Sequence, residues 1–259
     1  MLNETSSVDA SLYETLLVDD TIKSLDLRGK HIGDNGALCL SAALKINDTL
    51  TSLDLSENNI GDAGASAISE ALDVNDTLTT LNMSKNNIGD TGVHNFAMGL
   101  QVNEVLNELD LSENNIGDAG ASAIAEALDV NNTLTTLNMS KNNIGDTGVH
   151  NLALSLQVNE VLTVLDLSEN NFGDSGASFI SESLIFNNTL TTLNLSKNSI
   201  GDNGASSLCE ALNVNTILAK LDVSGNNISD FVLNSLSEAL KANATKRPIG
   251  KLRSFTHSQ

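Results

Sequence analysis

Two short segments of this 259-residue chain contain residue types at spacings that could do chemistry. Gly173-Asp174-Ser175-Gly176 has the form of a loop that presents a nucleophilic serine. The matching segment Gly61-Asp62-Ala63-Gly64 has no serine, so we interpret both as helix starts. Asp54-Leu55-Ser56-Glu57-Asn58 spaces its oxygen ligands like the start of a calcium loop, but it lacks the glycine and the final glutamate that such a loop needs. Neither segment predicts a catalytic or metal site.

The segments recur because the chain repeats every 28 residues. The pattern LxxLxLxxN occurs eight times, starting at Ile22, Leu50, Leu78, Leu106, Leu134, Leu162, Leu190 and Leu218. Leucines at positions four and six lie on one face of a short strand, and the following Gly-Asp-x-Gly segment leads into an amphipathic helical pattern. We expect the aspartate of that segment, Asp62 for example, to cap the helix it begins.

These eight tandem matches resemble the leucine-rich repeat, in its 28-residue ribonuclease-inhibitor-like subtype. The resemblance covers about residues 9–245 and implies an α/β fold, a right-handed solenoid or horseshoe with a parallel sheet on the concave face and helices on the convex face. The physics agrees, because one strand–helix unit cannot cover its own apolar side and must stack on its neighbours. The asparagine at position nine is expected to be buried and to satisfy backbone groups between strands.

Three parts are expected along the chain. Residues 1–21 form a half-repeat capping helix, residues 22–245 form the eight repeats, and residues 246–259 form a basic edge segment or tail. In the last repeat Val232 replaces the usual glycine, and Ile249 falls at the next position four beside Pro248. The tail therefore either closes the open edge of the sheet, or carries an export signal, or has no fixed structure.

The cysteines and histidines of the repeats are not expected to do chemistry. Cys39 and Cys209 lie six repeats apart, or at least about 29 Å by strand spacing, which exceeds the limit of about 7 Å for a disulfide. We expect both to be small buried residues in a reducing compartment. His94 and His150 stand at equivalent places on outer helices and are expected at the surface. We expect no catalytic residue, cofactor or metal, and no enzyme.

Charged side chains alternate along the expected concave face with a period of two repeats. Position five alternates between aspartate and asparagine, and position eight between glutamate and lysine. Alternation separates like charges and places opposite charges side by side. Either it only fixes the stacking, or it forms a recognition strip, in which breaks in the pattern at position three are the best clues. The candidate strip consists of Asp54, Glu57, Asn82, Lys85, Glu108, Asp110, Glu113, Asn138, Lys141, Val164, Asp166, Glu169, Asn194, Lys197 and Lys220.

Charge limits the class of partner. The formal net charge is −20, and all 33 acidic residues precede residue 241, whereas the last 19 residues carry five basic residues and no acid. An acidic body disfavours nucleic acid and favours a protein partner with a basic surface. The first residues lack the features of a signal peptide, and no run of 18 apolar residues predicts a membrane span.

The resemblance implies a non-catalytic protein-binding scaffold that uses its concave face. Near-identical repeats without cysteine caps also resemble proteins that intracellular bacterial pathogens deliver into host cells. That likeness implies a cytoplasmic, host-directed effector secreted without a classical signal peptide. Two alternatives stay open: a regulator of a small GTPase resembling Ran GTPase-activating proteins, and a structural or self-assembling protein. We expect a monomer.

Overall fold

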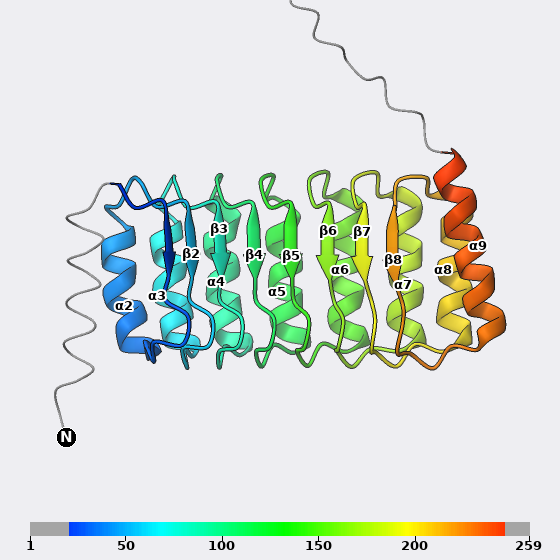
Figure 1. Cartoon of the computed structure of the whole chain (residues 1–259), viewed down its shortest axis with the longest axis horizontal. Helices are drawn as coiled ribbons and strands as arrows, with labels where there is room; N and C mark the ends of the chain where they lie inside the picture. The colour runs from blue at the N-terminus through cyan, green and yellow to red at the C-terminus, as the bar shows by residue number, and fades with distance from the viewer. Residues whose placement is uncertain (1–20, 247–259) are drawn as a thin grey trace, which may run out of the picture.

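The computed structural model of the chain describes residues 21–246. Eight strands form one parallel sheet in chain order, and a helix follows each strand (Figure 1). The strands are β1 (Ser24–Asp26), β2 (Ser52–Asp54), β3 (Thr80–Asn82), β4 (Glu108–Asp110), β5 (Thr136–Asn138), β6 (Val164–Asp166), β7 (Thr192–Asn194) and β8 (Lys220–Asp222). The helices are α2 (Gly33–Leu44), α3 (Asp62–Leu72), α4 (Asp90–Val102), α5 (Asp118–Leu128), α6 (Asp146–Val158), α7 (Asp174–Phe186), α8 (Asp202–Val214) and α9 (Asp230–Lys246).

The 28-residue period sets the register of the sheet. Each strand residue pairs with the residue 28 positions later, as Leu53 does with Leu81. The position-four leucines thus form one buried column, in which only the end members Leu25 and Leu221 stay half-buried. An end leucine has a described neighbour on one side only, so burial depends on stacking.

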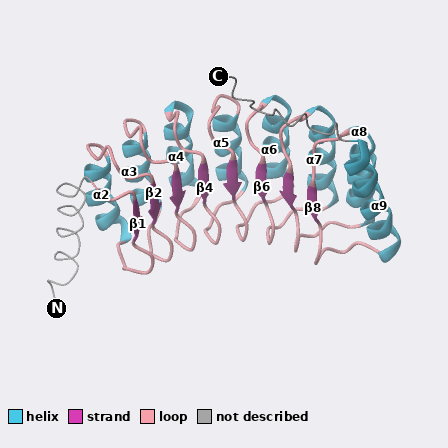
Figure 2. Cartoon of the chain, turned by 45° about the horizontal axis from the view of Figure 1, so that its top comes forward, coloured by secondary structure: helices cyan, strands magenta, loops and turns pink. Residues whose placement is uncertain are grey.

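Strands and helices form two separate layers, and the array curves with the strands on the inner side (Figure 2). Strands stack about 4.8 Å apart, whereas packed helices need about 8–10 Å between axes. This mismatch bends the stack. The expected solenoid, with its sheet on one face and its helices on the other, is confirmed.

The asparagines at position nine bridge consecutive repeats, as expected; Asn58, Asn86, Asn114, Asn142 and Asn170 are buried, and Asn198 and Asn226 are half-buried. The side-chain Nδ2 of Asn86 donates to the backbone oxygen of Leu55 in the preceding repeat at 3.0 Å. Its Oδ1 accepts from the backbone N–H groups of Asn58 and Ile60, at 3.0 and 2.9 Å. The turn after each strand cannot pair these groups by itself, so the asparagine satisfies them.

A second asparagine series does the same at the helix ends, and the sequence reasoning did not assign it this role. The Nδ2 of Asn75 donates to the oxygen of Leu44, at the end of the preceding helix, at 2.8 Å. Its Oδ1 accepts from Thr77 and Leu78 N–H groups at 3.2 and 2.8 Å. Asn75 also begins an Asn-x-Thr triplet, but it is buried and bonded, so the triplet belongs to the repeat rather than to a glycosylation site. The series is Asn47, Asn75, Asn103, Asn131, Asn159, Asn187 and Asn215.

The expected capping role of the Gly-Asp-x-Gly aspartates is wrong in one respect. Asp62 is the first residue of α3, whose cap position is Gly61 with no side-chain cap bond. The carboxylate instead reaches the next repeat: Asp34 accepts from Gly61 and Gly64 N–H groups at 2.7 and 2.9 Å. Side chains at a helix start point back toward the preceding turn, so each aspartate caps the next helix and ties two repeats together.

The ends of the described region differ from the inner repeats. α9 has 17 residues and continues past Asn243, where the inner helices have already ended. Asn243 therefore departs from the second asparagine series, and its Oδ1 is buried without a hydrogen bond. Val232, which replaces the usual glycine, is buried. The capping half-repeat and the tail with Pro248 and Ile249 fall outside the described residues, apart from Thr21 and Lys246 at the two limits.

None of the helices within residues 21–246 is both long and apolar enough to span a membrane.

We predict that Asn114→Ala lowers the free energy of unfolding by about 3 kcal/mol, because it leaves buried backbone donors and acceptors unpaired. Asn114 accepts from Ile88 N–H at 3.0 Å and donates to Met83 and Leu111 oxygens at 3.0 and 3.1 Å. Urea unfolding followed by circular dichroism measures the change. Asn115→Ala at the exposed neighbour is the control and should cost under about 0.5 kcal/mol. Equal losses in the two variants would contradict the structural role of Asn114.

Candidate protein-binding face

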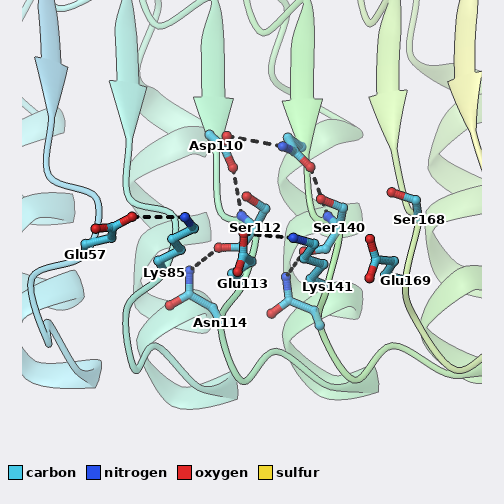
Figure 3. A network of polar contacts seen from close by, with 12 residues as sticks. Glu57, Lys85, Asp110, Ser112, Glu113, Asn114, Ser140, Lys141, Ser168 and Glu169 are labelled. Atoms are coloured by element: carbon cyan, nitrogen blue, oxygen red, sulfur yellow. Dashed lines mark hydrogen bonds and ion pairs between the residues drawn. The ribbon is translucent and has the colours of Figure 1, made fainter. Parts of the chain in front are cut away.

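Three rows of side chains run along the strand side of the solenoid. Position three is the first residue of each strand, position five is the last, and position eight lies in the turn after it. Figure 3 shows the position-five and position-eight side chains of neighbouring repeats lying next to one another in front of the helices. Every residue of the candidate strip therefore falls in one of three parallel rows, which we call the concave strip.

Position five does the same backbone work in every repeat, whichever residue occupies it. The Oδ1 of Asp54 accepts from Ser56 N–H at 2.8 Å, and the Oδ1 of Asn82 accepts from Ser84 N–H at 2.9 Å. The Nδ2 of Asn138 also donates to Asp110 Oδ2 at 3.1 Å. Since asparagine and aspartate close the turn equally, the turn does not require the aspartate charge.

Position eight carries ion pairs that close within each two-repeat unit. Lys85 Nζ lies 2.9 Å from Glu57 Oε1, Lys141 lies 3.1 Å from Glu113, and Lys197 lies 3.0 Å from Glu169. These partners are 28 residues apart, so each pair joins two neighbouring repeats. The alternation expected from the sequence thus brings opposite charges into contact. Exposed pairs of this kind stabilise a protein by only about 0.2–1 kcal/mol each.

Glu57 is at the centre of a three-residue cluster. Arg28 Nη2 lies 2.6 Å from Glu57 Oε1, the same oxygen that Lys85 approaches. The hydrogen bond from Arg28, followed by that from Lys85, lowers the pKa of Glu57. The bond to Glu57 in turn raises the pKa of Arg28. Likewise, the hydrogen bond to Glu113 raises the pKa of Lys141.

The backbone at position eight is left-handed in every repeat. Its φ angle lies between 53° and 61° at Glu57, Lys85, Glu113, Lys141, Glu169 and Lys197. The first and last repeats place Gly29 and Gly225 there, with φ of 64° and 70°. Side chains with a Cβ atom are disfavoured in this region, and glycine is not. The two glycines were the sequence signal for this conformation, which our sequence reasoning missed.

Two breaks in the repeat pattern meet in one hollow. Val164 and Lys220, both at position three, line a groove of about 490 Å³ over β6 to β8 together with Asp166 and Asp222. Glu108, the third such residue, begins β4, two strands away from β6, and does not line this groove. The sequence identified these residues correctly as unusual, but only the fold shows which of them lie together.

The histidines and cysteines of the repeats lie only partly where the sequence predicts them. His94 is exposed, but His150 is half-buried, with its ring 4.2 Å from that of Phe179. The expectation that both cysteines are buried is wrong: Cys39 is exposed and Cys209 is half-buried. Cys39 faces outward because it lies on α2 beside the buried stripe, not in it. Among residues 21–246, no three His, Cys, Asp or Glu side chains are grouped so that they could hold a metal ion.

The geometry defines a class of protein: an open α/β solenoid with one parallel sheet, stacked in register, that presents polar ladders on its strand side. A family model described as Leucine Rich repeat matches residues 20–41, 47–69, 74–97, 102–125, 130–153, 158–181, 186–209 and 214–230. The chain belongs to the leucine-rich repeat family. Proteins of this family are generally non-catalytic scaffolds that bind other proteins, so a protein partner is the class of ligand that the repeats indicate.

Two of the solved structures that are similar to parts of the chain serve as examples. One is the leiomodin-1 actin-binding site 2, with 24% identity, a TM-score of 0.44, and coverage of 49% of this chain and 73% of that one. The other is a pollen receptor kinase 3, with 18% identity, a TM-score of 0.38, and coverage of 62% and 67% respectively. No curated protein matches this chain.

We predict that Arg28→Gln raises the pKa of Glu57 toward its ordinary value, because the neutral amide stabilises the carboxylate less. A lowered folded-state pKa means that this carboxylate stabilises the fold above the ordinary glutamate pKa. The contribution is lost as the pH falls through the folded-state value. A side-chain carboxyl titration by NMR measures the shift. An unmoved Glu57 pKa would contradict the cluster.

We predict that Lys141→Val and Lys141→Gly affect stability differently. Valine adds crowding at its branched Cβ atom to the left-handed strain that Lys141 already bears, and it loses the ion pair with Glu113, so it should cost about 1 kcal/mol or more. Glycine removes that strain but loses an exposed ion pair and backbone entropy, so its net effect should stay within about 0.5 kcal/mol. Urea midpoints of both variants give the comparison. Similar losses for valine and glycine would show that the backbone at position eight is not strained.

Proposed function

We propose that this protein is a non-catalytic scaffold whose concave strip binds a protein partner with a basic surface. The membership of the leucine-rich repeat family supports a protein partner. The side chains of the concave strip indicate the chemical character of the partner's surface.

The left-handed backbone at position eight is the observation that carries the proposal. Six inner repeats place glutamate or lysine where glycine would avoid the strain, as Gly29 and Gly225 do at the ends. Each non-glycine residue there costs about 1 kcal/mol or more, which is as much as an exposed ion pair returns. Glutamate and lysine at position eight therefore stabilise the fold no more than glycine would. Contact of these charged side chains with a protein partner would explain their presence.

The charge of the concave strip favours a cationic partner. The position-eight glutamates and lysines pair with one another and cancel. Asp54, Asp110 and Asp166 at position five enter no ion pair among residues 21–246. Asp110 and Asp166 accept hydrogen bonds from the neutral side chains of Asn138 and Asn194, which do not cancel their charge. A basic surface complements this negative charge.

The finer assignments follow from the same proposal. The 11- to 13-residue helices in the inner repeats support the ribonuclease-inhibitor-like subtype. We infer that the protein acts as a host-directed effector, as a monomer, in a reducing cytoplasm. We also infer that the chain divides into three parts: a cap, the repeats and a tail. No observation favours regulation of a small GTPase, and a GTP hydrolysis assay with small GTPases tests that alternative directly.

We predict that Asp54→Asn, Asp110→Asn and Asp166→Asn together weaken capture of the partner roughly tenfold, because three complementary charges are lost. The fold should not change, since Asn82, Asn138 and Asn194 already close the same turn. Proteins captured from a host-cell lysate at low and high salt, quantified by mass spectrometry, give the readout.

The matched control changes Glu104, Glu160 and Glu182 to glutamine, which removes the same charge at exposed positions off the concave strip. This control variant should capture the same proteins, in the same amounts, as the unchanged chain. Equal loss in both triple variants would show that net charge alone drives the capture, and no loss in either would place the binding surface elsewhere.

A further inference from the structure

The convex face carries two equivalent grooves, 56 residues apart in the sequence. The first lies between α3 and α4 and has a volume of about 500 Å³. The second lies between α5 and α6 and has a volume of about 250 Å³. We refer to them as the first and second convex grooves.

Both grooves have one acidic wall and one apolar wall. Glu70 and Asp73 line the first groove on the side of α3, and Met98 and Val102 line it on the side of α4. Glu70 Oε2 already lies 3.1 Å from Lys45 Nζ, so Asp73 is the carboxylate of this wall that enters no ion pair among residues 21–246. In the second groove the same places hold Glu126 and Asp129 opposite Leu154 and Val158. The four apolar side chains are 49–61% exposed, although each is large. Apolar side chains that gather in a hollow beside charges mark a binding surface more often than scattered ones do.

The acidic walls are placed where the helices disfavour them. Asp73 and Asp129 are the C-cap residues of α3 and α5, beside the negative end of the helix dipole. The C-cap of α2 is Lys45, which suits that end. Burial, followed by the charge of Glu126, raises the pKa of Asp129. Negative charge is thus kept at two places that do not stabilise it locally, and a cationic group seated in the groove would stabilise it.

The two grooves differ through a pair of residues that change together. Ser69 Oγ in the first groove donates to the oxygen of Asn95 at 2.8 Å, and a Cβ atom at Gly99 would lie only 2.5 Å from that Oγ. A Cβ atom at position 99 would therefore crowd the Ser69 hydroxyl as it is placed here, and the missing side chain of Gly99 leaves the larger volume. The second groove has Ala125 and Ser155 at these two places, and its volume is half as large.

The third two-repeat unit lacks the pattern and serves as an internal control. Between α7 and α8, Ile185 stands where Asp73 and Asp129 stand, and Glu210 where Met98 and Leu154 stand. The wall formed by α7 thus has an apolar residue in place of an aspartate, and the wall formed by α8 has a glutamate in place of an apolar residue. The pairing of one acidic wall with one apolar wall is lost there.

We propose that the two convex grooves are docking sites for a peptide segment that presents a basic side chain next to apolar ones. The basic group pairs with the carboxylates of one helix while the apolar groups cover Met98 and Val102, or Leu154 and Val158, on the next. The charge of the walls excludes an anionic lipid surface as the occupant. This surface is on the opposite face from the concave strip and is independent of the function proposed above.

The test uses a short amidated Leu/Lys amphipathic peptide as the probe and the full chain carrying Asp54→Asn, Asp110→Asn and Asp166→Asn, so that the concave strip contributes little. Calorimetric titration should give two peptides per chain, with the first groove binding more tightly. Glu70→Gln with Asp73→Asn, or Met98→Gln with Val102→Gln, should each weaken the first site roughly fivefold. Ser69→Ala with Gly99→Ser should make the first site resemble the second.

The matched control is Glu182→Gln with Glu210→Gln, which removes the same charge from the convex face between α7 and α8. It should leave both sites unchanged. Equal weakening by this control, or no effect of the Met98 and Val102 changes, would overturn the proposal and leave only non-specific attraction to an acidic protein. NMR shifts outside the two grooves would overturn it as well. Failure here leaves the lysate result for the concave strip untouched.

Discussion

The structure depends on side chains that satisfy the backbone groups which a short repeat cannot pair within itself. Each strand has only three residues, and each inner helix is followed by a short connection to the next strand, so every repeat leaves N–H and C=O groups that it cannot pair by itself at two places. Asn86 bonds such groups after the strand, and Asn75 bonds them after the helix. Both reach into the preceding repeat. Since buried unpaired groups are costly, these asparagines fix the 28-residue spacing as firmly as the leucine column does.

Aspartates extend the same constraint to the helix starts. Asp34, Asp90, Asp118 and Asp146 each bond two N–H groups at the start of the next helix. A repeat is therefore tied to its neighbour at the strand, at both turns and at the helix start. Part of the negative charge of the chain follows from this role, which is why net charge alone says little about a partner. The charge that does bear on function is the part that the fold does not use.

The sequence predicts the architecture well and the site only in part. Eight repeats of Leu, Asn, Gly and Asp define strand, turn and helix so often that the pattern by itself specifies a solenoid. The target of Asp62 could not be predicted, because a cap within one helix and a cap onto the next one look identical in sequence. Nor could the exposure of Cys39, since the stripe on α2 fixes it by a single helical position. The strain at position eight was visible only as Gly29 and Gly225.

The two-repeat period appears on both faces of the solenoid. On the strand side it pairs Glu57 with Lys85, and on the helix side it places Asp73 opposite Val102, as it places Asp129 opposite Val158. These two pairs share no contact, so no single packing requirement can explain both. Copying of a 56-residue unit explains why they recur together. It does not explain why the third unit keeps Glu169 with Lys197 but places Ile185 and Glu210 on the convex face. The two faces have therefore diverged separately, which is expected if each answers to a different binding partner.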